Sequence, residues 1–138
     1  ESLRNYPTLM PIIGGQITSW FGYRTDPINR TRAFHSAVDI PAPAGTNVHA
    51  SGGGVVTYVG NRSGYGLVIY LDHGNGISTR YSHNSRNLVV EGQRVERGEV
   101  IALVGRTGRA ISNHLHYEVL RDDRQVDPVP FITEFLSE

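Results

Sequence analysis

Two amino acids are absent from this 138-residue sequence: cysteine and lysine. Without cysteine, neither a disulfide bond nor a thiolate metal site can form. All 13 basic residues are therefore arginines, and covalent carriage of a cofactor on a lysine side chain is excluded. The formal net charge is zero, so the chain lacks the basic excess that usually accompanies nucleic-acid binding.

Long apolar runs are also absent, and none is long enough to span a bilayer. The sequence starts at Glu1 rather than at a methionine, and it shows no signal peptide. We therefore expect a processed product or an excised domain, whose N-terminal anchoring or inhibitory segment lies outside this sequence.

Glycine is abundant, with 16 residues, and proline, asparagine, aspartate and serine separate short apolar runs. This pattern is typical of an all-β domain with many turns, and the length fits a single domain over residues 1–138. No long window repeats apolar residues with a helical period, so little helix is expected. The expected strands are Asn47–Ala50, Gly53–Val59, Leu67–Leu71, Ile77–Ser82, Val100–Val104 and His114–Leu120.

Turns and irregular segments are expected around these strands. The segment Asp72–Gly76 predicts a hairpin loop, and Val89–Gly98 predicts short extended pieces broken by turns. The polar stretch Tyr23–Phe34 is typical of a solvated loop. Pro130–Leu136 is the best helix candidate, with one or two turns near the C-terminus.

The segment Asn113–Val119, NHLHYEV, carries two histidines within an expected strand. Side chains alternate across a strand, so His114, His116 and Glu118 share one face, opposite the apolar residues. Residues two apart lie about 7 Å apart along a strand, so both imidazoles can reach one small site. The alternative is a pair of exposed or hydrogen-bonded histidines on a half-buried sheet.

A second cluster, FHSAVDI, places His35 and Asp39 four residues apart. In a straight strand they would be about 13 Å apart, so the chain must curl or bulge between them if both bind one metal ion. Histidine nitrogen and aspartate oxygen are both zinc ligands. Taken alone this spacing is a weak signal, and so is a third segment, Tyr81–His83. His49 and His73 have no partner at useful spacing, and we interpret them as structural or surface residues.

Together these segments resemble the M23 peptidases, the lysostaphin-type and LytM-type zinc endopeptidases. The family pattern runs H-x-G-x-D, then Y-x-H, then H-x-H followed by an aromatic residue and glutamate. Here the three motifs read HSAVD, YSH and HLHYE, in the same order. The segments ITSWFGYRTDP, GYGLVIYLDHGNG and VDPVPFI have family counterparts as well. The resemblance covers nearly the whole chain, and the ordered motifs form a strong signal where each alone is weak.

The resemblance implies roles for five residues. His35, Asp39 and His116 would be the ligands of one Zn²⁺ ion, and His83 and His114 would be the catalytic histidines. Spacing alone does not decide which of His114 and His116 binds the metal, and that assignment comes from the family. The implied fold is an open antiparallel β-sheet architecture with loops around a groove.

Within that fold we expect a lead-in segment at residues 1–22, a polar groove loop at 23–34, a catalytic β-core at 35–120 and a C-terminal tail with a short helix at 121–138. Glu118 is a candidate partner for a histidine N–H. Its alternative is a solvated carboxylate or a partner for a nearby arginine. The sequence departs from the family at Ala37, where glycine is usual. Some members also carry a tyrosine in the loop before the first ligand, and here the stretch Thr25–Ala33 has none.

The implied activity is hydrolysis of the peptide cross-links of bacterial peptidoglycan by a zinc-activated water, in the periplasm or outside the cell. Arg24, Arg30 and Arg32 are candidate contacts for substrate carboxylates, because guanidinium binds carboxylates in bidentate fashion. One alternative is a LytM-like regulator, non-catalytic or autoinhibited, that activates another cell-wall hydrolase as its protein partner. Such domains typically lack one or more zinc ligands, and this sequence keeps all three. A non-catalytic zinc-binding or glycan-binding module is a weaker alternative.

Overall fold

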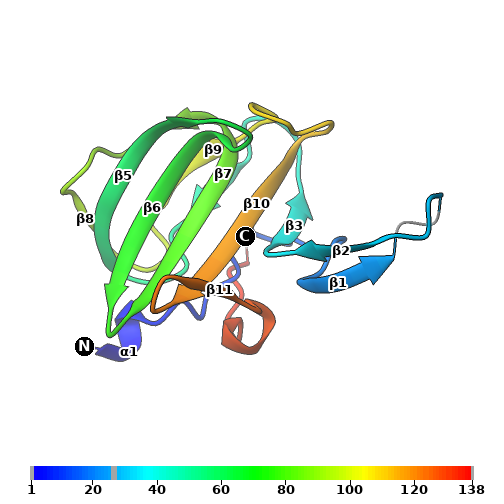
Figure 1. Ribbon diagram of the computed structural model, residues 1–138. Helices are drawn as coiled ribbons and strands as arrows, with labels where there is room; N and C mark the ends of the chain where they lie inside the picture. The colour runs from blue at the N-terminus through cyan, green and yellow to red at the C-terminus, as the bar shows by residue number, and fades with distance from the viewer. Residues whose placement is uncertain (1, 26–27, 138) are drawn as a thin grey trace.

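Nearly all regular structure in this computed structural model, which describes residues 2–25 and 28–137, is β (Figure 1). Its strands are β1 Gly22–Thr25, β2 Arg32–His35, β3 Val38–Pro41, β4 Asn47–His49, β5 Gly54–Arg62, β6 Gly66–Gly74, β7 Ile77–Asn87, β8 Arg94–Val95, β9 Val100–Val104, β10 His114–Arg121 and β11 Arg124–Val126. A four-residue helix, α1 (Ser2–Asn5), and one 3-10 turn, η1 (Val129–Phe131), complete the regular structure. Among the described residues, no helix is long and apolar enough to cross a membrane.

The main sheet contains nine strands, and its central order is β11-β10-β7-β6-β5-β8. Each pair of neighbouring strands in this order is antiparallel. Strand β3 adds to the free edge of β10, and β9 pairs with both β4 and β7. Strands β1 and β2 form a separate hairpin that projects away from the sheet beside β3 (Figure 1).

Alternation along the strands separates an apolar face from a polar face. In β10, Leu115, Tyr117 and Val119 are fully buried, and they join one cluster with Ile69 and Leu71 from β6 and β7's Tyr81. Burial of one Val, Leu or Ile side chain in such a cluster stabilises the fold by roughly 1.5–3 kcal/mol. The opposite face of β10 is thereby left for polar side chains.

A chain of hydroxyl groups runs through the buried face of the sheet. Tyr117, Ser51, Tyr81 and Thr79 follow one another at 2.7–2.8 Å, and the chain ends at Nε2 of His73, 2.7 Å from the Thr79 hydroxyl. The Nδ1–H of His73 donates to the Gly53 carbonyl. Burial lowers the pKa of His73 despite that hydrogen bond, so the ring is neutral at pH 7. His49 is likewise buried, with its Nδ1 2.8 Å from the Gly98 carbonyl. Both histidines are structural, as expected.

All six strands expected from the apolar runs are present, most of them a few residues longer than expected. The short β8 lies within the segment Val89–Gly98, where extended pieces were expected. The Asp72–Gly76 loop is tighter than expected, because β6 continues to Gly74 and the turn is made by Asn75 and Gly76 at positive φ.

Two sequence-based expectations were wrong. The stretch Tyr23–Phe34 is not simply a loop, because its ends pair as the β1–β2 hairpin, with Phe34 packed edge-on against Tyr23 and Phe21. The polar composition of the stretch concealed this aromatic cross-strand packing.

The predicted helix at Pro130–Leu136 is reduced to the single turn η1. The backbone N–H groups of Thr133 and Glu134 donate to the Thr8 carbonyl, and the Glu134 carbonyl accepts from Met10 N–H. These bonds hold the tail in an extended conformation against the N-terminal segment, so the helix cannot continue. Helix α1 was not expected from the sequence.

We predict that Thr79→Val lowers the free energy of unfolding by about 1–3 kcal/mol, because it leaves buried partners of the hydroxyl chain without a hydrogen bond. Denaturant titration followed by circular dichroism measures the change. Thr57→Val is the control: its hydroxyl is exposed, and a surface change of this kind alters stability by about 0.5 kcal/mol or less. Equal stability of the two variants would contradict a structural role for the hydroxyl chain.

Candidate metal centre

Strand pairing brings the sequence-predicted ligands to one point. In the β3–β10 ladder Asp39 lies opposite His116, and His114 lies opposite Pro41. His35 ends β2, and the chain breaks its extended course at Ser36 and Ala37 before β3 begins. This break supplies the curl that the four-residue spacing requires, and Asp39 N–H is further held by the Ser19 carbonyl at 2.9 Å.

The side chains of His35 and His116 converge on the Asp39 carboxylate. Its Oδ2 lies 3.5 Å from Nε2 of His35, and its Oδ1 lies 3.4 Å from Nδ1 of His116. One ligand atom from each of the three residues lies within 4.8 Å of the others, a spacing at which one metal ion can be held. Asp39 Oδ1 is buried and has no hydrogen-bond partner among the described residues, which suits an atom that binds a cation. Two imidazole nitrogens and one carboxylate oxygen are a donor set that zinc accepts.

Hydrogen bonds on the far side of each ring fix which nitrogen faces the centre. The Nδ1–H of His35 donates to the Trp20 carbonyl at 3.1 Å, which leaves Nε2 toward Asp39. The Nε2–H of His116 donates to Glu118 Oε2 at 2.9 Å, which leaves Nδ1 toward Asp39. Outer partners of this kind orient metal-binding imidazoles and raise their basicity.

His83 and His114 lie beside this centre. Their ring centroids are 4.9 Å apart, and the His83 ring is 5.6 Å from that of His116. The Nδ1–H of His83 donates to the Thr107 carbonyl at 2.7 Å, and that of His114 donates to the Ser112 carbonyl at 3.0 Å. Each ring therefore turns Nε2 away from its carbonyl partner, and Nε2 of His114 lies 3.6 Å from Asp39 Oδ1.

His83 reaches the site through an unusual backbone conformation. Ser82 pairs with His116 and shares its face, so the next residue in a regular strand would point to the opposite face. Instead His83 has φ of 66°, a left-handed conformation that costs a non-glycine residue roughly 1–3 kcal/mol. The ladder with β6 and the ladder with β9 shift register on either side of this region. This distortion turns the His83 ring toward the other histidines.

Glu118 and Ala37, two further residues noted in the sequence, are both buried. Glu118 is fully buried, so it is not a solvated carboxylate; it bonds His116 and also lies 3.6 Å from Nη1 of Arg80. Ala37 is fully buried without a positive φ, so the extra methyl group causes no backbone strain.

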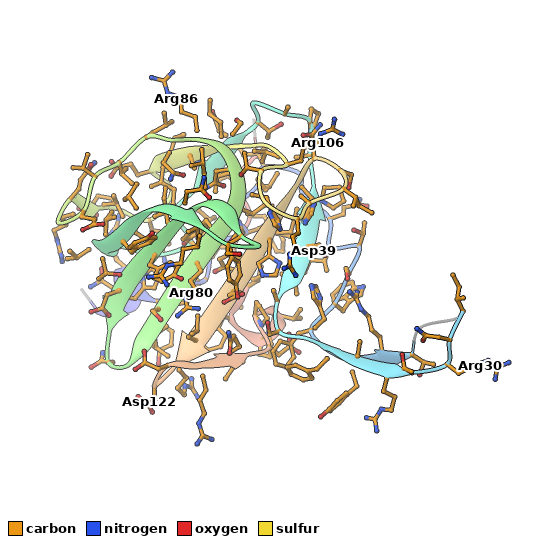
Figure 2. The ribbon with its side chains drawn as sticks, turned by 45° about the horizontal axis from the view of Figure 1, so that its top comes forward. Arg30, Asp39, Arg80, Arg86, Arg106 and Asp122 are labelled. Carbon is orange, nitrogen blue, oxygen red and sulfur yellow. The ribbon has the colours of Figure 1, made fainter. Side chains whose placement is uncertain are left out.

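The three arginines of the β1–β2 hairpin do not gather at the centre. Arg24 donates to the Ser19 hydroxyl, and the Arg32 guanidinium stacks over the Tyr23 ring at 4.2 Å. Figure 2 shows Arg30 at the outer end of the hairpin, far from Asp39.

Two residues at the site had no signal in the sequence. The Tyr65 ring, from the turn between β5 and β6, lies 5.7 Å from the His116 ring. Partial burial, together with the Glu118 carboxylate, raises the pKa of Tyr65. Arg80 of β7 faces Glu118 across the β7–β10 ladder. Neither residue could be identified from the sequence, because their contacts depend on cross-strand register, which the sequence alone does not define.

The charges of the cluster shift three pKa values. Burial alone would raise the pKa of Asp39, but the contact with His116 and the nearby imidazoles outweigh it and lower the pKa. Burial lowers the pKa of His83, and the neighbouring histidines add to that effect, so His83 is neutral at pH 7. Burial would also lower the pKa of His116, but its contacts with Asp39 and Glu118 prevail and raise the pKa to about 9.

Comparison with known proteins identifies the class first. The fold is similar to a crystal structure of a zinc-containing peptidase from Vibrio cholerae, with a TM-score of 0.81 and 34% identity, covering 96% of this chain and 40% of that one. The model of peptidase family M23 matches residues 33–128. The chain belongs to peptidase family M23.

Two curated relatives give further comparisons. The chain is 44% identical over 119 residues to the DD-carboxypeptidase/endopeptidase Mpg of Neisseria meningitidis serogroup B, covering 86% of this chain and 27% of that protein. It is 42% identical over 104 residues to the peptidoglycan DD-endopeptidase ShyA of Vibrio cholerae, covering 75% of this chain and 24% of that protein. The chain thus spans about a quarter of the length of these relatives.

The raised pKa of His116 predicts that cation binding depends on pH. Below pH 9 the metal-free ring is protonated, so a divalent cation must displace a proton from Nδ1 before it can bind there. We expect affinity for zinc to fall about tenfold for each unit that the pH decreases from 8.5 to 7, with release of about one proton per ion. Calorimetric titration in two buffers of different ionisation enthalpy counts that proton. Affinity that does not change over this range would contradict binding at His116.

Proposed function

We propose that this domain is a zinc-dependent endopeptidase that hydrolyses peptide cross-links of bacterial peptidoglycan. The observation that carries the proposal is the convergence of His35, Asp39 and His116 beside two further histidines, in a chain of peptidase family M23. The similarity to a protein named a peptidoglycan DD-endopeptidase supports the choice of substrate. The chain on this proposal is one catalytic domain of a longer protein of the bacterial cell envelope.

His35, Asp39 and His116 would hold one Zn²⁺ ion. A zinc ion with three protein ligands supplies a Lewis acid that activates water and polarises the scissile carbonyl. The protein's part is to keep the three ligand atoms in place. The Trp20 carbonyl and the Glu118 carboxylate do so for the two imidazoles, and the Ser19 carbonyl does so for the backbone of Asp39.

His83 and His114 would carry protons during the reaction. Because the Nδ1–H of each is bonded to a backbone carbonyl, proton exchange with substrate or water takes place at Nε2. The lowered pKa of His83 leaves its Nε2 unprotonated at pH 7, so it can accept a proton. One of the two histidines orients or deprotonates the attacking water, and the other stabilises the oxyanion or protonates the leaving amine.

Substrate would lie as an extended peptide across the cluster around Asp39, beside the β1–β2 hairpin. On this proposal the hairpin arginines contact carboxylates of the peptide stem. Of the three arginines, Arg24 is connected most directly to the centre. It donates to the Ser19 hydroxyl, whose oxygen lies 3.5 Å from Nδ1 of His35. Arg30, at the outer end of the hairpin, would contact substrate farther from the scissile bond.

The alternative is a regulator that binds metal yet cleaves nothing. It differs from the enzyme in one measurable respect, since digestion of purified sacculi would yield no new peptide ends. Digestion of sacculi of known cross-link type, with and without a chelator and followed by mass spectrometry, decides between the two and identifies the bond that is cut.

Substitution of the five central residues separates ligands from proton carriers. We predict that His35→Ala, Asp39→Ala or His116→Ala abolishes both zinc content and activity, because each removes one of three ligands. His83→Ala and His114→Ala should retain zinc and lose activity, by roughly 10²–10⁴-fold for a general acid or base. Elemental analysis and the sacculus assay on the same preparations measure both quantities.

His49→Gln is the matched control for these five variants. The residue is a buried histidine whose Nδ1 bonds the Gly98 carbonyl, and it lies outside the cluster around Asp39. It should keep zinc content and activity if it folds. Full activity in any of the three ligand variants would overturn the assignment.

The arginine contacts predict a change in KM. Replacing Arg24, Arg30 and Arg32 together with glutamine should raise KM for purified muropeptides about tenfold or more, because one lost charge-assisted hydrogen bond amounts to about 1.5–3 kcal/mol. The zinc content should not change. An unaltered rate on muropeptides across the whole concentration range would refute the contact.

A further inference from the structure

Glu118 is a fully buried carboxylate on the same strand face as the metal centre. Its Oε2 accepts the Nε2–H of His116 at 2.9 Å. Its Oε1 has no hydrogen-bond partner among the described residues, and Nη1 of the Arg80 guanidinium lies 3.6 Å from it. A buried carboxylate requires a compensating charge close by. Arg80 supplies that charge without taking the place of His116.

Cross-strand register explains how Arg80 comes to lie there. Arg80 of β7 is opposite Glu118 of β10 on one side and opposite Tyr70 of β6 on the other. The guanidinium stacks over the Tyr70 ring at 4.3 Å, which fixes the position of its long side chain. In Figure 2 Arg80 lies along the sheet between Asp39 and Asp122.

We propose that Arg80 is a positioning residue of the metal centre, whose positive charge holds Glu118 in the orientation in which it accepts the Nε2–H of His116. Glu118 pairs with both Arg80 and His116, and only one of its oxygens is bonded to the histidine. With Arg80 beside Oε1, the Glu118 carboxylate cannot rotate or turn toward solvent without separating its charge from that of the guanidinium. His116 therefore keeps Nδ1 directed at Asp39. The proposal rests on the proposed zinc site and adds the device that maintains one of its ligands.

The test compares two arginines whose guanidinium groups both stack over the Tyr70 ring. Arg80→Gln removes the charge beside Glu118, and Arg80→Lys keeps a charge there. Arg62→Gln is the matched control, because Arg62 also stacks over Tyr70 and Tyr58, at 5.5 and 4.4 Å, and makes no ion pair with Glu118. If the Gln variant does not fold, Arg80→Met takes its place, since its unbranched side chain packs on the ring without a charge.

Zinc affinity, measured by competition with a chromophoric chelator, is the first readout. We expect Arg80→Gln to weaken zinc binding by roughly tenfold to a hundredfold, as loss of an outer partner of a metal ligand typically does. Arg80→Lys should stay within about threefold of the parent, and Arg62→Gln should match it. Affinity in Arg80→Gln equal to the parent, or equal losses in the Lys and Gln variants, would overturn the proposal.

A double-mutant cycle tests whether Arg80 acts through Glu118. In a Glu118→Gln background, Arg80→Gln should weaken zinc binding by less than about twofold, because the group that it holds is gone. The same full loss in both backgrounds would show that Arg80 acts independently of Glu118, and the proposal would fail.

A second readout needs no metal. The Nε2–H of His116, bonded to a buried carboxylate, should give a slowly exchanging downfield proton resonance in the metal-free protein. That resonance should persist in Arg62→Gln and broaden or disappear in Arg80→Gln. If the parent protein bound no zinc, the proposed function would fail, and this resonance would still decide the role of Arg80. An unchanged resonance in Arg80→Gln would refute that role.

Discussion

The carboxylate of Asp39 is the interaction on which the rest of the site depends. It lies opposite His116 in the β3–β10 ladder, and its oxygens lie within 3.6 Å of nitrogens from three different imidazoles. One of those oxygens, Oδ1, is buried without a hydrogen bond to any residue that the structure describes. A group placed in this way requires a cation, whether protons on the imidazoles or a metal ion, and the surrounding sheet keeps the requirement in place.

The sequence predicted those parts of the site that follow from strand alternation. His114, His116 and Glu118 could be assigned to one face because β10 is regular, with buried Leu115 and Tyr117 between them. The fold class followed from short apolar runs and frequent turns. The six expected strands form because burial of their apolar faces outweighs the local conformational preference of their residues.

Other features could not be predicted because they depend on contacts between distant segments. His83 reaches the site through a positive φ that a regular strand does not have. The hairpin β1–β2 is held by edge-on aromatic packing within a polar stretch. The tail beyond η1 is extended because Thr8 and Met10 bond to it. Arg80 and Tyr65 become neighbours of Glu118 and His116 only when the strands are in register.

Strand β10 serves two purposes at once. Its front carries His114, His116 and Glu118, and its back carries Tyr117, which begins the hydroxyl chain that ends at His73. Each face fixes the other, because a shift of one residue would exchange the imidazoles with the core side chains. Chemistry and stability therefore constrain the same register.

Both rings that flank the metal ligands take their orientation from one connection, the loop between β9 and β10. The Thr107 carbonyl holds His83, and the Ser112 carbonyl holds His114, whereas His35 and His116 are held by Trp20 and Glu118 outside that loop. Substitutions that change the conformation of this loop would therefore displace His83 and His114 together and leave the cluster around Asp39 in place. A domain of this architecture can thus lose its two flanking imidazoles through changes in one loop while it keeps the three side chains of the candidate metal centre.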